Sequence, residues 1–317
     1  MILRLLASLL SLPFLLMAVP AFADDEILAE LGPAQLGHLD RVPAWVIELP
    51  PTVSSVLIAD AAENALIRYR HVDGRLRRAE SRYMSVGQNG IGKQRAWDRK
   101  TPLGIYFMTE ELDTTRLHDK YGVRAFVLDY PNVLDRRAGR TGNGIWLHGV
   151  DPATPLRPPR DTDGCLALPN DELLTLERHL AVHDTPILVA RRTLLVAAES
   201  VERTRVELRA ALERWRRSVQ ERALFDHIEL YSDEYRADGM DRQALATFRL
   251  DSFSAARHER VSLDNIMMLG DPELQDVYLT RFTLTLDGGA EEATRFTKRL
   301  YWRRQDGAWR IIAEGAG

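Results

Sequence analysis

Short apolar runs, each bounded by turn-forming residues, dominate the chain between residues 53 and 190. The runs at 53–59 and 65–71 are separated by polar residues 60–64, which predicts a β-hairpin. A helix is expected at about 172–181, capped by Asn170 and the two residues after it. Many short strands with few helices predict a mostly β domain over residues 51–192. The remaining strand-like runs are 75–86, 105–109, 125–128, 144–148 and 186–190.

The pattern changes near residue 194, where apolar residues begin to recur at helical spacing among many charges. Residues 231–253 predict a further pair of helices. Four strand-like runs follow, with hairpin turns at 287–289 and 306–307. Helices followed by long antiparallel strands predict an α+β domain over residues 193–317. The buried face of the first helix is expected to hold Val206, Leu208, Ala211, Leu212, Trp215 and Val219.

The first residues have the layout of an export signal. Arg4 precedes an apolar run, the small residues Ala21 and Ala23 fit a cleavage site, and acidic residues follow at once. We expect residues 1–23 to be a cleaved signal peptide and residues 24–50 to be an N-terminal lead-in. An uncleaved anchor is the alternative. No later run is apolar enough to cross a bilayer.

Charge and cysteine content narrow the possible functions. The 42 basic and 46 acidic residues give a net charge of −4, and loss of Arg4 with the signal peptide makes it −5. That balance gives no reason to expect a nucleic-acid partner. A single cysteine excludes an internal disulfide and a multi-cysteine metal site. A metal site would need two further ligands, for which His118, His179 and His183 are available, but they lack tight ligand spacing. We expect no metal and no cofactor.

The single cysteine, Cys165, follows His148 along the chain, and each has a glycine beside it. A thiolate is the reactive form of cysteine, and a neighbouring histidine can accept the proton and stabilise the thiolate as an ion pair. Gly164 is expected to leave room for the substrate backbone, and it allows positive φ before the nucleophile. Backbone N–H groups near Cys165 are expected to bind the developing oxyanion. The alternative is a buried apolar cysteine and a core histidine with no chemistry.

The motif His148-Gly149, a loop, then Thr162-Asp163-Gly164-Cys165 resembles the L,D-transpeptidase catalytic domain (YkuD type) of bacterial wall enzymes. Residues 98–106 are similar to a second family motif, Lys-Thr-Pro-x-Gly-x-Tyr/Phe. The resemblance implies a β-sandwich with Cys165 as nucleophile and His148 as general base and acid. It also implies a periplasmic enzyme that cleaves a peptidoglycan tetrapeptide stem before its terminal D-alanine. Transfer to a second stem's amine makes a cross-link, and transfer to water is an L,D-carboxypeptidase reaction.

Substrate contacts are expected from six residues near the motifs: Gly149, Thr162, Asp163, Gly164, Tyr106 and Trp146. For Tyr106 and Trp146, ordinary core packing is the alternative. Asp163 departs from the family pattern, and we expect it to face solvent or to pair with Arg157 or Arg160.

Basic residues near the two motifs are further candidates. Three basic residues are candidates for binding a substrate carboxylate: Lys93, Arg99 and Lys100. The alternative is that they form a solvated basic turn with no role in binding. The arginine-rich stretch around residues 124–140, which includes Arg140, is a candidate lid or substrate wall.

The C-terminal part resembles the cone-shaped α+β fold of nuclear-transport-factor-2-like (NTF2-like) domains. The resemblance rests on a helix with Trp215, the segment 231–235 and the strand at 309–311. The pairing of the two domains is similar to the cell-shape L,D-carboxypeptidases of curved bacteria. The sequence therefore predicts a cysteine-dependent L,D-transpeptidase, with an L,D-carboxypeptidase and a non-catalytic wall-binding protein as alternatives. Peptidoglycan stem peptides are the expected partners, and some members of the family join or detach a wall-linked lipoprotein instead.

Overall fold

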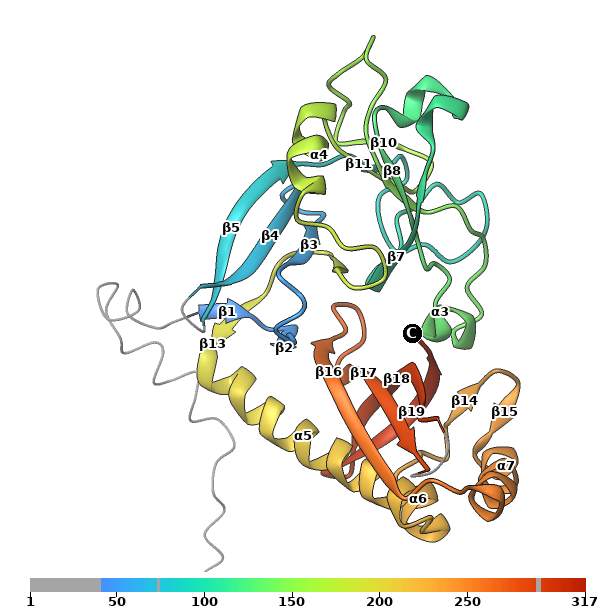
Figure 1. Cartoon of the computed structure of the whole chain (residues 1–317). Helices are drawn as coiled ribbons and strands as arrows, with labels where there is room; N and C mark the ends of the chain where they lie inside the picture. Colours follow the sequence, from blue (N-terminus) through green and yellow to red (C-terminus); the bar gives the residue numbers. More distant parts are fainter. Residues whose placement is uncertain (1–40, 73–74, 289–291) are drawn as a thin grey trace, which may run out of the picture. The chain divides into compact units, whose positions relative to one another are not determined.

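The computed structural model describes residues 41–72, 75–288 and 292–317, and residues 41–317 form one compact unit (Figure 1). The predicted signal peptide and residues 24–40 of the lead-in lie outside the described residues. In the described ranges, no helix combines the length and apolarity needed to span a bilayer.

An eight-stranded sheet is the framework of the first half of the chain (Figure 1). β3 pairs antiparallel with β4 as the predicted hairpin, β12 runs parallel to β3, and β11 runs parallel to β9. In spatial order its strands are β11 (Leu166–Ala167), β9 (Trp146–His148), β8 (Ala125–Leu128), β7 (Gly104–Leu112), β12 (Pro186–Ala190), β3 (Val56–Asp60), β4 (Ala65–Val72) and β5 (Arg75–Tyr83).

Short elements surround this sheet. A parallel two-stranded pair joins β6 (Val86–Gly87) to β10 (Arg160–Thr162). The helices are the 3-10 turns η1 (Thr114–Arg116) and η2 (Asp119–Tyr121), and the α-helices α3 (Val133–Arg137) and α4 (Asn170–Glu177).

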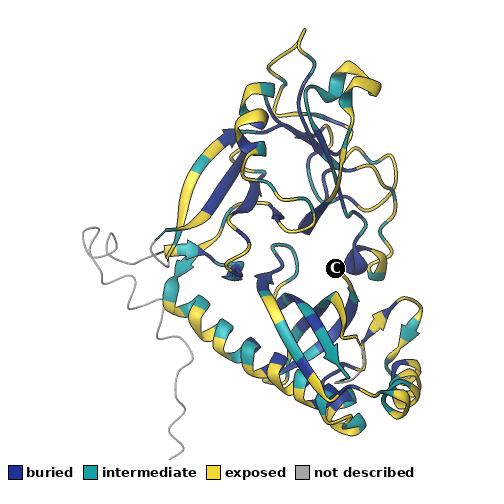
Figure 2. Cartoon of the chain, viewed as in Figure 1, coloured by how far each residue is buried: buried dark blue, intermediate teal, exposed yellow. Residues whose placement is uncertain are grey.

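The central strands are buried on both faces, which explains why their sequences are continuously apolar (Figure 2). In β3, Leu57 belongs to a core cluster made within the first half of the chain, whereas Ile58 belongs to a cluster shared with the C-terminal domain. In β7, Tyr106 likewise belongs to the first cluster and Phe107 to the shared one. Because successive side chains of a strand point to opposite faces, the second face of the sheet packs on the C-terminal domain.

The C-terminal domain has a five-stranded sheet in the order β19-β18-β17-β16-β2. The apolar side of α5 packs on it, with the Trp215 and Phe282 rings 5.5 Å apart. The mostly β domain and the α+β domain expected from the sequence are confirmed. The elements are α5 (Ala198–Gln220), α6 (Leu224–Glu229), α7 (Arg242–Ala255), β16 (Arg260–Gly270), β17 (Val277–Asp287), β18 (Thr294–Gln305), β19 (Ala308–Ala316) and β2 (Val46–Glu48).

Three expectations about these elements were wrong. The predicted lead-in contributes two strands, since β2 joins the C-terminal sheet and β1 (Arg41–Pro43) pairs with β13 (Leu195–Ala197). The expected helix pair at 231–253 is a short hairpin of β14 (Arg236–Ala237) and β15 (Met240–Asp241), followed by α7. Val206 is 56% exposed, whereas the other five residues of the predicted α5 stripe are buried.

Candidate active site

The pairing of β9 with β11 brings the two motif residues together. Leu166 lies opposite Leu147, and Ala167 lies opposite His148, in a parallel ladder. Cys165 directly precedes β11 and so continues this register toward Trp146. Paired residues of neighbouring strands, and alternate residues of one strand, share a face of the sheet. Cys165 and His148 therefore lie on the same face of adjacent strands.

The turn before the cysteine is built from Thr162 and Gly164. The Thr162 hydroxyl donates to the Cys165 carbonyl at 2.7 Å and accepts from the Gly164 amide at 3.1 Å. Gly164 has φ of 125°, and an added Cβ would lie 2.7 Å from the Lys100 carbonyl oxygen. The predicted positive φ is confirmed, and no larger residue fits without displacing the backbone. Thr162 is buried, so it shapes the turn and does not offer a surface to substrate.

The His148 ring is fixed from its backbone side. Its Nδ1 lies 2.6 Å from the Gly149 carbonyl oxygen. A carbonyl can only accept, so this contact requires the proton on Nδ1 and leaves the lone pair on Nε2. The Tyr121 ring packs edge-on against the imidazole at 5.2 Å between centroids. Burial lowers the pKa of His148 to about 4, so the ring is neutral at pH 7.

The Asn170 side chain holds the backbone that carries this carbonyl. Its Oδ1 accepts from the Val150 amide at 2.9 Å, and its Nδ2 donates to the Val150 carbonyl at 2.8 Å. A Cβ on Gly149 would lie 2.2 Å from Asn170 Oδ1, so this close approach requires glycine at 149. The expected capping of α4 by Asn170 was wrong, because Pro169 is the N-cap and no side chain caps the helix.

The Cys165 thiol is protonated in this environment. Its Sγ donates to the Gly144 carbonyl at 3.5 Å. Burial raises the pKa of Cys165 to about 11, and a hydrogen bond from the Trp146 amide and the charge of Lys120 lower it by less. Since the His148 imidazole is also neutral, the resting pair is thiol and imidazole, and the expected thiolate–imidazolium ion pair is not the resting state.

Charged residues lie above the pair. Asp163 is 65% exposed, and its carboxylate oxygens lie 3.8 Å from Arg99 Nε and 3.5 Å from Lys120 Nζ. The expectation that Asp163 faces solvent is confirmed, whereas the expected pairing with Arg157 or Arg160 was wrong. Arg157 instead faces Asp161 at 4.0 Å.

Two aromatic residues expected to contact substrate have different positions. Trp146 is half-buried and packs on Tyr121 with ring centroids 4.6 Å apart, and Tyr121 also contacts the His148 ring. Tyr106 is fully buried, and its hydroxyl donates to the Leu103 carbonyl at 2.9 Å. The expectation that Tyr106 contacts substrate was therefore wrong, because no part of its side chain reaches a surface.

The basic residues of the turn at 93–100 also differ in their exposure to solvent. Lys93 is buried, and its Nζ lies 2.8 Å from Asp98 Oδ1, so it holds the turn together and does not reach substrate. Arg99 remains exposed and donates to Gln88 Oε1 at 2.9 Å. Only the exposed residues of this turn remain candidates for contact with a ligand.

Sequence reasoning missed Tyr121 and Asn170. Tyr121 ends the single 3-10 turn η2, for which no periodic pattern exists. Asn170 was read as a helix cap because asparagine next to acidic residues is typical of helix starts. The glycine at 149, which we expected to contact substrate, was the one signal that a side chain approaches the backbone closely there.

Comparison with known families agrees with this architecture. Residues 54–189 match the L,D-transpeptidase catalytic domain family (YkuD), and residues 207–315 match the Cds6 C-terminal NTF2-like domain family. No curated protein sequence matches the chain.

Two solved structures resemble nearly the whole chain. Bd1075 of Bdellovibrio bacteriovorus has a TM-score of 0.71 at 23% identity, over 88% of this chain and 98% of that one. The helical cell shape determining protein Pgp2 of Campylobacter jejuni has a TM-score of 0.70 at 24% identity, over 83% of this chain and 91% of that one. At such identities the likeness establishes the fold.

The chain therefore has a YkuD-type L,D-transpeptidase catalytic domain followed by a C-terminal NTF2-like domain.

Proposed function

We propose that this chain is a peptidoglycan L,D-transpeptidase that works through a thioester on Cys165. The observation that carries the proposal is the geometry around His148. Its Nδ1–H is bound to the Gly149 carbonyl, which leaves Nε2 as the proton acceptor on the face it shares with the thiol. That tautomer suits a general base, and the membership of residues 54–189 in the L,D-transpeptidase family supports the assignment.

The chemistry starts from the neutral pair. His148 Nε2 takes the thiol proton as Cys165 Sγ attacks the carbonyl carbon of the bond before the stem's terminal D-alanine. The C–N bond breaks as the imidazolium returns the proton to the leaving amine, which gives a thioester and free D-alanine. An amine of a second stem then attacks the thioester carbon, loses its proton to His148, and releases the thiol.

A backbone donor is available for the developing oxyanion. In the parts of the chain that the structure describes, the Cys165 amide has no recorded acceptor, whereas the Gly164 amide is used by Thr162. An amide one bond from the nucleophile's own Cα can point at the tetrahedral oxygen that forms on attack. We assign the Cys165 N–H this role.

Positive charge near the pair suits a substrate with a free carboxylate. The charges of Lys120 and Arg157 lower the pKa values of both His148 and Cys165. Lys120 is 41% exposed and lies between Asp163 and the Tyr121 ring. We propose that Lys120 binds the carboxylate of the terminal D-alanine, which makes this end of the site selective for stems that end in a free acid.

An L,D-carboxypeptidase, in which water takes the place of the acceptor amine, is the second candidate. The support for this candidate is the resemblance of the two-domain sequence to the cell-shape L,D-carboxypeptidases, and Pgp2, a helical cell shape determining protein, shares the fold over 83% of this chain. We further propose that the protein acts on the wall in the periplasm, in keeping with the predicted signal peptide, and that it affects cell shape. A lipoprotein substrate and a silent wall-binding role are the other outcomes of the test.

Purified protein incubated with disaccharide-tetrapeptides distinguishes these functions. Cross-linked dimers indicate a transpeptidase, and tripeptides with released D-alanine indicate a carboxypeptidase. The Cys165→Ala variant should give neither product, and His148→Gln should lose at least about a hundredfold in kcat because the general base is gone. Full activity in Cys165→Ala would refute the thioester mechanism. Absence of any product, together with wall binding unchanged by Cys165→Ala, would favour the silent binding protein.

A further inference from the structure

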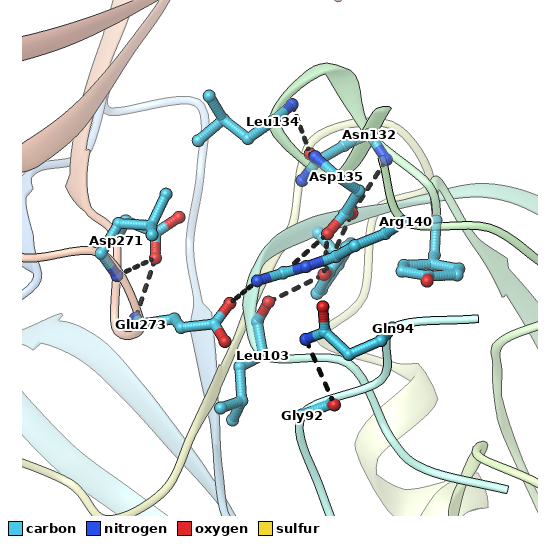
Figure 3. Close-up of polar contacts among 12 residues, drawn as sticks. Gly92, Gln94, Leu103, Asn132, Leu134, Asp135, Arg140, Asp271 and Glu273 are labelled. Atoms are coloured by element: carbon cyan, nitrogen blue, oxygen red, sulfur yellow. Dashed lines mark hydrogen bonds and ion pairs between the residues drawn. The ribbon is translucent and has the colours of Figure 1, made fainter. Parts of the chain in front are cut away.

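Arg140 joins the catalytic domain to the C-terminal domain (Figure 3). Its Nη1 lies 3.0 Å from Asp135 Oδ1, and its Nη2 lies 2.6 Å from Glu273 Oε2. Glu273 belongs to the turn between β16 and β17, where Asp271 Oδ1 accepts from the Glu273 amide at 2.8 Å. The guanidinium therefore bridges one carboxylate from each domain.

The catalytic-domain end of this bridge is rigid. Asp135 is buried, and its Oδ2 accepts from the Asn132 amide at 3.0 Å and lies 3.2 Å from the Tyr106 hydroxyl. The Arg140 amide donates to the Asp135 carbonyl at 2.9 Å. This network explains why Tyr106 is in the core, since its hydroxyl supports Asp135 and not a ligand.

Residues 140–144 lead directly from this bridge to the thiol. Thr141 is the second anchor, because its amide donates to the Gln94 carbonyl at 3.1 Å and its carbonyl accepts from the Tyr130 hydroxyl at 3.1 Å. At the end of the segment, the Gly144 carbonyl accepts the Cys165 S–H.

The backbone of this segment is rich in glycine and is open at its Gly144 end. Gly139, Gly142 and Gly144 all have positive φ, and a Cβ added at Gly139 or Gly144 would meet nothing within 4 Å. Glycines in such open positions have wide conformational freedom. A Cβ at Gly142 would lie 3.1 Å from Ala96 Cα, so the middle of the segment is packed and its end at Gly144 is open. The position of the Gly144 carbonyl therefore depends on this packing and on the anchors at Arg140 and Thr141.

We propose that Arg140 is a positioning residue through which Glu273 of the C-terminal domain holds the Gly144 carbonyl against the Cys165 thiol. The bond from the thiol to Gly144 fixes the direction of the sulfur and stabilises its protonated form. Loss of Glu273 frees one arm of the guanidinium and loosens the segment. The thiol then ionises more easily but is no longer aimed by its acceptor. The catalytic meaning of this positioning rests on the proposed function of Cys165, whereas the change in thiol reactivity does not.

The test compares Glu273→Ala and Glu273→Gln with a matched control in the full chain. Asp184→Ala is the control, because it removes another carboxylate that pairs across the same two domains, with Arg281 at 3.0 Å, and lies outside residues 140–144. The alkylation rate of Cys165 by iodoacetamide is measured against pH by intact mass. Glu273→Ala should raise the rate at pH 8 by roughly threefold to tenfold, through a lower thiol pKa. Glu273→Gln should change it less, because its amide oxygen still accepts from Arg140, and Asp184→Ala should leave it unchanged.

Turnover of tetrapeptide gives a second readout. Glu273→Ala should lower kcat about tenfold with KM little changed, because substrate contacts remain while the sulfur is misdirected. An unchanged alkylation profile in Glu273→Ala overturns the proposal, and so does an equal shift in Asp184→Ala, which would indicate general loosening of the domains. If Glu273→Ala fails to fold, Glu273→Ser, which also removes the carboxylate that pairs with Arg140, is judged by the same criteria. A shifted alkylation profile in a protein that turns over no stem peptide would keep the positioning role and refute the proposed function.

Discussion

The protonation state of the Cys165 and His148 pair can be tested without knowing the substrate. Burial raises the pKa of Cys165 to about 11 and lowers that of His148 to about 4. With one pKa unit equal to about 1.36 kcal/mol, the gap of seven units between 11 and 4 opposes the ion pair by roughly 10 kcal/mol before the two charges attract each other. The resting thiol should therefore be much less reactive than an unfolded one.

Two opposing factors set the expected ratio of the alkylation rates of Cys165 in native and unfolded protein. Raising the thiol pKa from 9.0 to about 11 reduces the thiolate at neutral pH about a hundredfold. A more basic thiolate is intrinsically a better nucleophile, by roughly eightfold for two pKa units. The net expectation is alkylation roughly tenfold slower in the native protein than in urea, and slower still because the sulfur is almost completely buried.

The assay measures iodoacetamide alkylation of Cys165 by intact mass between pH 6 and pH 10, in native and in urea-unfolded protein. The native rate should keep rising across this range. His148→Gln should follow the same pH dependence, because a neutral imidazole does not stabilise a thiolate electrostatically. A native rate above the unfolded rate, with a plateau below pH 7 that His148→Gln abolishes, would show that the pair is ionised at rest and that the reasoning from burial is wrong.

Three further predictions follow from the same structure. Gly164→Ala should destabilise by about 2–4 kcal/mol and abolish turnover, since the new Cβ meets the Lys100 carbonyl; thermal unfolding and turnover check this, and a fully active variant would contradict it. Asn170→Ala should cost about 1–3 kcal/mol and lower kcat more than KM, since the Val150 backbone loses its partner; urea unfolding and kinetics check this, and an unchanged kcat would count against it. Burial lowers the pKa of His227 to about 3, so the unfolded state binds the proton first and stability falls as pH drops from about 6.5 toward 3. His227→Phe should recover about 3 kcal/mol at pH 4.5 relative to pH 7 in urea unfolding, and equal pH dependence in both proteins would refute the assignment.

The fold could be predicted where a local pattern decides it. Apolar runs between turn residues predicted β3, β4, β8 and β12 to within a few residues, because strands buried on both faces need continuous apolar sequence. The helical stripe of α5 was right except at Val206, which is exposed. The predicted type and bounds of an element were wrong where residues distant in the sequence decide its structure. β2 is a strand only because the edge of β16 is available to it.

In the candidate site too, residues with local signals could be predicted and residues placed by distant segments could not. Cys165, His148 and Gly164 could be found from the sequence because their chemistry and the positive φ are local properties. Tyr121 and Asn170 could not, because they reach the imidazole and its supporting backbone from other segments of the chain. Tyr106 was misassigned because the motif gives no sign that its strand is buried on both faces at this point.

The alternation of side chains in the catalytic sheet also bears on what the C-terminal domain does. Ile58 and Phe107 belong to the same core cluster as Trp302 of β18. Arg299 crosses to the same face, with its guanidinium 4.4 Å from the Phe107 ring centroid and paired with Asp129. Asp129 Oδ1 in turn accepts from the Phe107 amide at 2.8 Å. An apolar core that spans two domains is not easily opened, because separation would expose one face of the catalytic sheet to water. The NTF2-like domain therefore covers one face of the catalytic-domain sheet and shares a hydrophobic core with it. Because the two domains are held together in this way, Glu273 of the β16–β17 turn can act on residues 140–144.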